Sequence, residues 1–104
     1  MENGRPKHDN LRPRAVAVMV LLRGGMAGRG RISDALGDDT VLETQDLMGD
    51  LELLGLVQRA RGHQRVWILT FDGVGWLESR GLKVADRAKR EVSEAFDASL
   101  GVTL

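Results

Sequence analysis

The stretch from Leu51 to Leu77 constrains the fold most, because signals for helix ends, strands and turns alternate over a short distance. Its opening leucines lead to Gly55, a residue suited to the left-handed conformation that closes a helix. Residues 56–61 mix apolar and basic positions, and residues 66–69 are β-branched, aromatic or aliphatic, which is typical of strands. Between them, Gly62-His63-Gln64-Arg65 predicts a tight turn with basic flanks.

A short helix is expected after this hairpin, from Phe71 to Ser79. Thr70 precedes it and has the side-chain oxygen needed to cap its first turn. Gly73 and Gly75 lie inside it, and each costs about 1 kcal/mol relative to alanine in a helix. Packing must therefore hold the helix, and Trp76-Leu77 are the residues expected to supply it.

Two local patterns stand in order around the hairpin, Leu51-Glu52-x-x-Gly55-Leu56-Val57 and Leu69-Thr70-x-x-Gly73-x-x-x-Leu77. Together they resemble bacterial and archaeal winged helix-turn-helix regulators of the MarR and PadR type. The resemblance implies a mainly α fold with a small β-hairpin (α+β), built from a three-helix core, a wing and a C-terminal helix. In that family a basic residue often follows the first glycine of the second pattern. Val74 stands there instead, which removes one phosphate contact.

Length and composition indicate one domain of ordinary globular type. The chain has 104 residues, of which 42% are hydrophobic and 29% charged. It has no cysteine, which excludes a disulfide framework and a thiolate zinc site. The longest apolar run, residues 15–22, is too short to span a bilayer and lacks a signal-peptide cleavage pattern. We therefore expect a cytoplasmic protein with no membrane contact.

The N-terminal segment is polar, and residues 1–10 are expected to form a mobile, basic arm. Its candidate DNA-binding residues are Arg5, Lys7, Arg12 and Arg14. Such an arm could lie along DNA or enter a minor groove. The alternative is a solvated tail that only aids solubility.

The winged-helix domain is expected over residues 11–81, and its first helix begins at Asn10 or Pro13 and ends near Arg23. The residues of this helix are apolar on almost every side, so the helix should be buried on most sides. A buried strand is the competing interpretation of residues 15–22. The glycine-rich residues 24–30 lack the Gly-Lys-Ser/Thr ending of a phosphate-binding loop. They predict a flexible connection, followed by a short strand at Arg31-Ile32 as in the family.

A short helix over residues 32–36, closed by Gly37, should form the first half of the helix-turn-helix. Residues 38–40 would be the turn, and Val41–Leu54 the recognition helix. Its core-facing stripe is Leu47, Met48, Leu51 and Leu54. The outward residues expected to contact DNA are Thr40, Glu43, Thr44 and Gln45, and Gln45 is the best candidate for reading base edges.

Charge is the main difficulty for this interpretation. The chain is neutral overall, but residues 1–31 carry +5, residues 32–55 carry −7 without a single base, and residues 56–104 carry +2. Either the recognition helix enters a groove by its N-terminal end only, and the wing and arm supply affinity, or this face binds a basic protein partner.

The hairpin supplies the clearest basic cluster, and its residues are expected to contact phosphates or the adjacent minor groove. They are Arg59, Arg61, His63, Gln64 and Arg65. The alternative is that the basic side chains only protect an exposed sheet edge. His63 is expected to be a turn residue rather than a metal ligand.

The segment 82–100 predicts a C-terminal helix with apolar and small residues at steps of three and four. Its expected dimer contacts are Ala85, Ala88, Val92, Ala95, Phe96 and Ser99. The alternative is a helix folded back on its own domain. Residues 101–104 are expected to be a tail.

No arrangement of Cys, His, Ser or paired carboxylates in the sequence matches a catalytic or metal-binding pattern, so we expect neither an enzyme nor a cofactor. The leading hypothesis is a DNA-binding transcriptional regulator, a repressor of prokaryotic or phage type, that binds double-stranded DNA as a homodimer. The alternative is a winged-helix protein-interaction module, such as an adaptor, a complex subunit or a phage inhibitor, whose acidic helix binds a basic protein.

Overall fold

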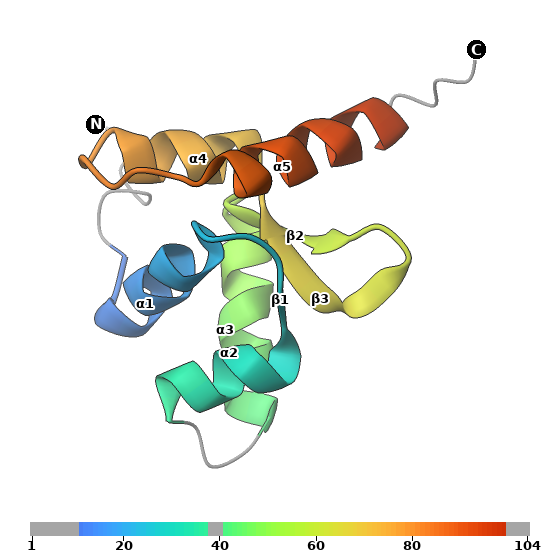
Figure 1. Cartoon of the computed structure of the whole chain (residues 1–104). Helices are drawn as coiled ribbons and strands as arrows, with labels where there is room; N and C mark the ends of the chain where they lie inside the picture. Colours follow the sequence, from blue (N-terminus) through green and yellow to red (C-terminus); the bar gives the residue numbers. More distant parts are fainter. Residues whose placement is uncertain (1–10, 38–40, 100–104) are drawn as a thin grey trace, which may run out of the picture.

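The computed structural model describes residues 11–37 and 41–99, which form an α+β globule (Figure 1). In chain order its elements are α1 (Pro13–Leu22), β1 (Ala27–Gly28), α2 (Arg29–Leu36), α3 (Val41–Leu53), β2 (Val57–Ala60), β3 (His63–Leu69), α4 (Phe71–Glu78) and α5 (Asp86–Ser99). The described part of the chain thus contains five helices and a three-stranded antiparallel sheet, as expected for the α+β class.

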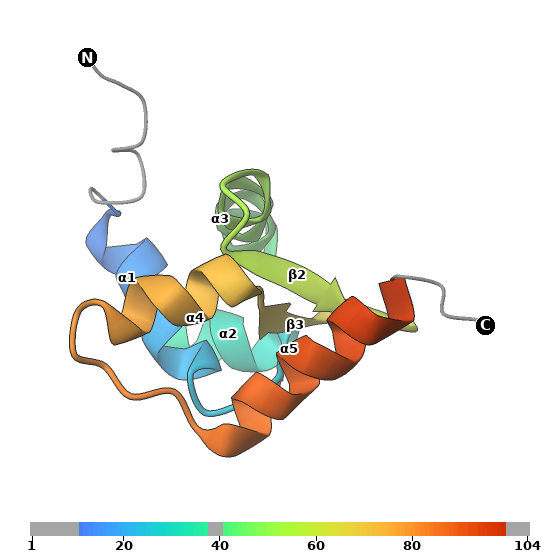
Figure 2. The same ribbon diagram turned by 90° about the horizontal axis from the view of Figure 1, so that it is seen from above.

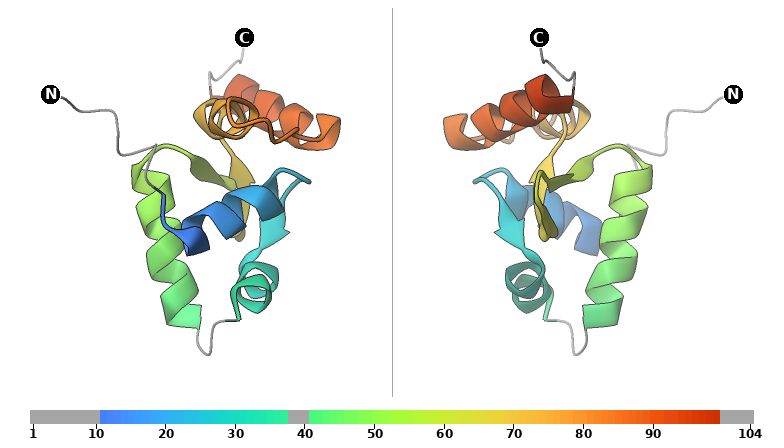
Figure 3. Two further views of the ribbon diagram at one scale, coloured as in Figure 1. Left: turned by 90° about the vertical axis from the view of Figure 1, so that its left-hand side faces the viewer. Right: turned by 90° about the vertical axis from the view of Figure 1, so that its right-hand side faces the viewer.

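The sheet has the strand order β1-β3-β2, so the last strand in sequence lies in the middle. Gly28 pairs with Val66, and Val57 pairs with Leu69. Seen from above, α4 and α5 lie over one end of this sheet (Figure 2). The remaining helices, α1, α2 and α3, lie below α4 and α5 (Figures 1 and 3). The β2–β3 hairpin projects to one side of the globule (Figure 1).

The first helix is the centre of the core. Ala15, Val18, Met19 and Leu22 are buried, while Val16 is only half-buried. The helix begins at Pro13, where a proline costs nothing because the first-turn amides have no helical acceptor. The helical prediction for residues 15–22 is confirmed over the buried-strand alternative. Burial on most sides is confirmed only in part.

The prediction of a short strand at Arg31-Ile32 is wrong. The strand, β1, lies at Ala27–Gly28, and α2 begins at Arg29, three residues before the expected start at residue 32. The extended backbone of Gly28 pairs with β3 and serves as the N-cap of α2, so the chain turns helical directly after it. The other end of α2 is as predicted, because Gly37 takes a left-handed conformation with φ 69°.

The turn of the hairpin is shorter than the sequence suggested. Residues 61–62 form the turn, and Gly62 has φ 78°, which reverses the chain at once. Ala60 therefore already pairs with His63, beside an irregularity in the β2 register. The expected turn residues His63, Gln64 and Arg65 belong to β3.

The junction between β3 and α4 is built as predicted. The hydroxyl of Thr70 accepts a hydrogen bond from the amide of Gly73 at 3.0 Å, and also donates to the carbonyl of Gly55. The amide of Thr70 donates to the carbonyl of Leu56. One threonine thus caps α4 and joins it to the end of α3. Trp76 is buried and supplies the expected packing, together with Leu77.

The C-terminal helix starts later than predicted, at Asp86 instead of Leu82. Val84 is fully buried in the preceding segment, and the amide of Ala85 donates to the carbonyl of Arg23 at 2.9 Å. These contacts hold residues 82–85 out of a helix. Within α5, Ala88 and Val92 are buried against the chain's own core. The helix therefore folds back on its own domain through these two residues, which were expected to meet a partner.

An ion pair joins α4 and α5. Lys89 Nζ lies 2.8 Å from Glu78 Oε2, and the hydrogen bond lowers the pKa of Glu78 and raises the pKa of Lys89. The Glu78 contribution is present above the unfolded pKa and is lost as pH falls through the lowered folded pKa. The Lys89 contribution is present below its unfolded pKa and is lost as pH rises through the raised one. Both side chains are exposed, so the pair orients the helices more than it stabilises them.

No helix within residues 11–37 and 41–99 is both long enough and apolar enough to cross a lipid bilayer.

Candidate nucleic-acid interface

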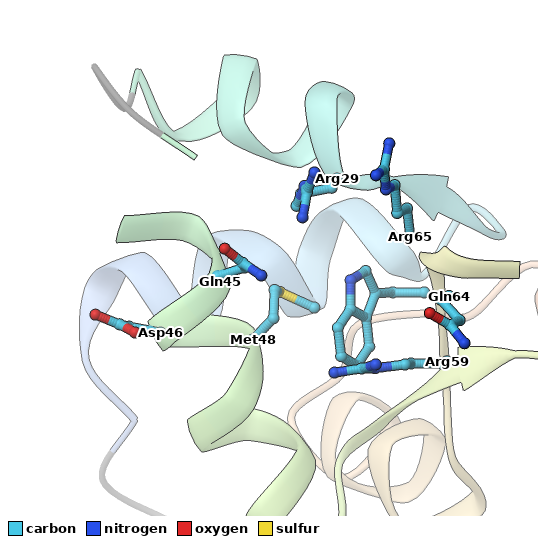
Figure 4. A pocket seen from close by; sticks show the side chains of 8 residues that line it. Arg29, Gln45, Asp46, Met48, Arg59, Gln64 and Arg65 are labelled. Atoms are coloured by element: carbon cyan, nitrogen blue, oxygen red, sulfur yellow. The ribbon is translucent and has the colours of Figure 1, made fainter. Parts of the chain in front are cut away.

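A pocket of about 400 Å³ opens between α2, α3 and the β2–β3 hairpin (Figure 4). It is lined by Arg29, Gln45, Asp46, Met48, Arg59, Gln64, Arg65 and Trp67. Three arginines and two glutamines therefore converge on one hollow from four different elements. We call it the α3–hairpin pocket.

Two of the arginines form one wall of this pocket. Arg29 is the first residue of α2, and Arg65 lies on β3. Figure 4 shows the two side chains next to each other, above the floor formed in part by Met48. The neighbouring pair Gly28 and Val66 is joined by the β1–β3 ladder, so the sheet fixes the backbone separation between Arg29 and Arg65.

The third arginine is held differently. The guanidinium carbon of Arg59 lies 5.1 Å from the ring centroid of Trp67, and its Nε lies 3.9 Å from Glu52 Oε2. Both contacts attract a cation, one through the ring quadrupole and one through a carboxylate. Arg59 is thereby oriented across the face of the indole, on the side of the pocket opposite Arg29 (Figure 4).

The wall around Arg29 was missed in the sequence analysis, which assigned residues 24–30 to a flexible connection. A signal was present, because two arginines, Arg29 and Arg31, stand within three residues before Ile32, the first buried residue of α2. The first turn of α2 has neither a side-chain cap nor an acidic residue. The positive end of the helix dipole adds to the positive potential there.

The residues of α3 that were expected to contact DNA divide between three environments. Gln45 is exposed and lines the α3–hairpin pocket. Thr44 is 0% exposed, so its expected outward orientation is wrong. It precedes Met48 and Leu51 by four and seven residues, which places it on their buried side of the helix. Glu43 is exposed on the side facing α1, and Thr40 lies outside the described residues.

Arg12 and Arg14, the residues of the basic arm within the described part of the chain, do not line this pocket. Arg12 and Arg14 line a separate hollow on the other side of α3, together with its acidic residues. Its other lining residues are Glu43, Asp46, Leu47 and Asp50. Arg12 and Arg14 therefore lie where they offset the negative charge of α3. Arg5 and Lys7 lie outside the described residues.

The hairpin presents its polar residues on two sides. Arg59, Gln64 and Arg65 line the α3–hairpin pocket. Arg61 and His63 instead line a hollow facing α5, whose lining also includes Glu91 and Glu94. All five hairpin residues are exposed and lie within three residues of Gly62, so cations stand on both sides of the hairpin tip.

Among the residues described, no group of three or more His, Asp or Glu side chains is placed to hold a metal ion. The pocket therefore offers cationic and amide hydrogen-bond donors rather than a metal-binding set. Comparisons with protein families, with curated proteins and with solved structures found no match to this chain.

Proposed function

We propose that the protein is a winged helix-turn-helix DNA-binding regulator, a transcriptional repressor of prokaryotic or phage type. The order of elements supports this proposal. A helix and a short strand precede a pair of helices, α2 and α3, and an antiparallel hairpin follows at once. In this arrangement α3 takes the position of the recognition helix and the β2–β3 hairpin that of the wing.

The observation that carries the proposal is the α3–hairpin pocket. Its three arginines come from α2, β2 and β3, and the only acid among its lining residues is Asp46. Figure 4 shows Asp46 on the far side of α3 from Arg65. A chain with no net charge thus presents a local cationic surface. Such a surface is what phosphate backbones require, because attraction depends on where charge is placed.

The exposed side chains suggest separate roles in phosphate contact and in base contact. Arg61 and Arg65 contact backbone phosphates, which gives affinity and register but no sequence information. Gln45 is the α3 side chain with an amide directed to the pocket, and an amide can pair with adenine in the major groove. The acidic flank of α3 remains outside the contact, beside Arg12 and Arg14.

A homodimer is part of this proposal, and an exposed aromatic pair supports it. Phe71 on α4 and Phe96 on α5 are both about half exposed and pack edge to face, with ring centroids 5.3 Å apart. Exposed aromatic residues are enriched at protein interfaces. Since Ala88 and Val92 are occupied internally, the contact between subunits would use Phe96 rather than the inner face of α5. Solution mass by light scattering tests this point.

The test of the proposed function is a gel-shift titration of the full chain against unrelated duplex fragments, at low and at moderate salt. The expected result is retention at low salt that weakens steeply as salt rises, because each phosphate contact releases counterions. Absence of retention at low salt would overturn the proposed function.

Gln45→Ala is expected to relax sequence preference while leaving affinity for unrelated sequences nearly unchanged. A good base contact provides about 1–3 kcal/mol of discrimination, so the preferred site should lose roughly tenfold or more of its advantage. The measurement is competition between a selected site and unrelated duplex. Equal losses on both DNAs would contradict a base-reading role and indicate a phosphate contact instead.

A second candidate function is a protein-interaction module, favoured by one observation on α3. Leu53 is 88% exposed and Leu42 is 66% exposed, eleven residues apart and therefore on the same side of the helix. No basic residue lies between them, and Asp46 and Asp50 are exposed there. This surface suits a basic protein partner better than a phosphate backbone, and it is the explanation to adopt if the gel shift fails.

A further inference from the structure

We infer that Arg29 and Arg65 together hold one phosphate group in the α3–hairpin pocket, and that Arg59 does not share in it. This inference rests on the proposed function in one respect, since a DNA backbone would supply the phosphate. The shared chemistry is a phosphate anion, which a free nucleotide or inorganic phosphate could also supply.

The lining of the pocket selects an anion. Arg29, Arg59 and Arg65 are its charged donors, and Gln45 and Gln64 add amide donors. Guanidinium groups match phosphate oxygens with two parallel hydrogen bonds, so two arginines on one wall can enclose a single phosphate. The floor offers little exposed apolar surface to an uncharged ligand, because Met48 is fully buried and Trp67 nearly so.

The backbone positions of Arg29 and Arg65 are set by the sheet before any ligand arrives. Arg29 follows Gly28, and Arg65 precedes Val66, and Gly28 and Val66 are ladder partners. A methyl group added at Gly28 would lie 3.8 Å from the carbonyl oxygen of Arg65, so the two chains run close together here. Two arginines whose backbone is fixed by one ladder lose less conformational freedom on binding than two arginines on separate loops.

Arg59 is already engaged within the protein. Its guanidinium lies over Trp67 at 5.1 Å, and Glu52 holds its Nε at 3.9 Å. Repulsion from the nearby Glu52 carboxylate opposes the approach of a phosphate to Arg59. Arg59 therefore shapes the pocket, and the opposite wall binds the anion.

The experiment measures affinity for a short duplex as a function of salt, for the full chain and for Arg29→Gln, Arg65→Gln and the double variant. Each single substitution is expected to weaken binding about tenfold, the effect of losing one charged hydrogen-bonded contact. In the double variant, the slope of log affinity against log salt should change by roughly 0.9, the value for one phosphate contact. Only one contact is lost because both arginines bind the same phosphate. Arg90→Gln on the exposed face of α5 is the charge-matched control.

Two results in this series would overturn the inference. One is a slope change of roughly 1.8 in the double variant, which means two separate phosphates. The other is a loss in Arg59→Gln as large as that in Arg29→Gln. The shared site is supported if Arg59→Gln loses less affinity than Arg29→Gln, and if the loss in the double variant differs from the sum of the two single losses in free energy.

A second arm separates this inference from the proposed function. The chain has two tryptophans, so in a Trp76→Phe background the fluorescence of Trp67 reports on the pocket alone. Pyrophosphate is the probe, with calorimetry on the unsubstituted chain as a check that needs no tryptophan replacement. A response that Arg29→Gln abolishes supports the phosphate site even if duplex DNA is not bound. Duplex binding with a salt slope unaffected by the double variant leaves the proposed function standing and overturns the shared phosphate site.

Discussion

Gly73→Ala is expected to lower the free energy of unfolding by roughly 3 kcal/mol, the upper end of the cost of overpacking a core. Gly73 is buried in the first turn of α4, and a methyl group there would overlap the carbonyl oxygen of Leu56. It would also lie 3.2 Å from Leu69 Cδ2. Because the obstacle is backbone, α4 would have to move away from the end of α3. Urea unfolding, followed by helical circular dichroism, measures the effect.

The matched control lies two residues away in the same helix. Gly75 is exposed, and a methyl group there meets no atom within 4 Å. Gly75→Ala should therefore raise the free energy of unfolding by up to about 1 kcal/mol, through helix propensity alone. Effects of the same sign in the two variants would contradict the close approach of α4 to Leu56.

The second large effect concerns the hairpin. Replacing Arg61 and Arg65 together with alanine is expected to weaken binding to duplex DNA of every sequence by about a hundredfold, if each arginine provides a charged contact of roughly 1.5 kcal/mol. The salt dependence should flatten by about one phosphate for Arg61 and by less than one for Arg65, because Arg29 still contacts the phosphate that it shares with Arg65. Fluorescence anisotropy against several unrelated duplexes gives both quantities.

Both arginines are exposed, so their removal should leave the urea midpoint unchanged. Arg87→Ala together with Arg90→Ala on α5 is the control, since it removes the same charge from another face. Unchanged affinity in the hairpin variant would falsify the role assigned to this element. An equal loss in the α5 variant would point to a general effect of net charge.

Local signals in the sequence were sufficient for several elements. Gly37 and Gly55 adopt the left-handed conformations that end α2 and α3, and Thr70 caps α4 through Gly73. These features depend on one residue and its neighbours, so they can be predicted without the rest of the chain.

Other features depend on contacts between distant segments, and these the sequence did not disclose. The strand at Ala27–Gly28 exists because β3 offers it a partner. The delayed start of α5 reflects the hydrogen bond from Ala85 to Arg23, and the inward burial of Ala88 reflects packing on the core. A period of three and four residues marks an apolar face. It does not say whether that face meets the same chain or another one.

The candidate site was predictable in part. The hairpin cluster and Gln45 were identified from residue type and position, and Gln45, Arg59, Gln64 and Arg65 do line one pocket. Thr44 was misplaced because its polar side chain suggested exposure, although its spacing from Met48 places it inside. Arg29 was missed because its role depends on β1 bringing the start of α2 beside β3.

The most direct test of the central claim is a map of backbone amide chemical shifts on titration with a short duplex at low salt. The account predicts changes concentrated at the start of α2, around Gln45 and along residues 59–65, with α5 and the Leu42–Leu53 side of α3 nearly unaffected. Changes confined to that side of α3, or a spectrum unaltered by DNA, would contradict it.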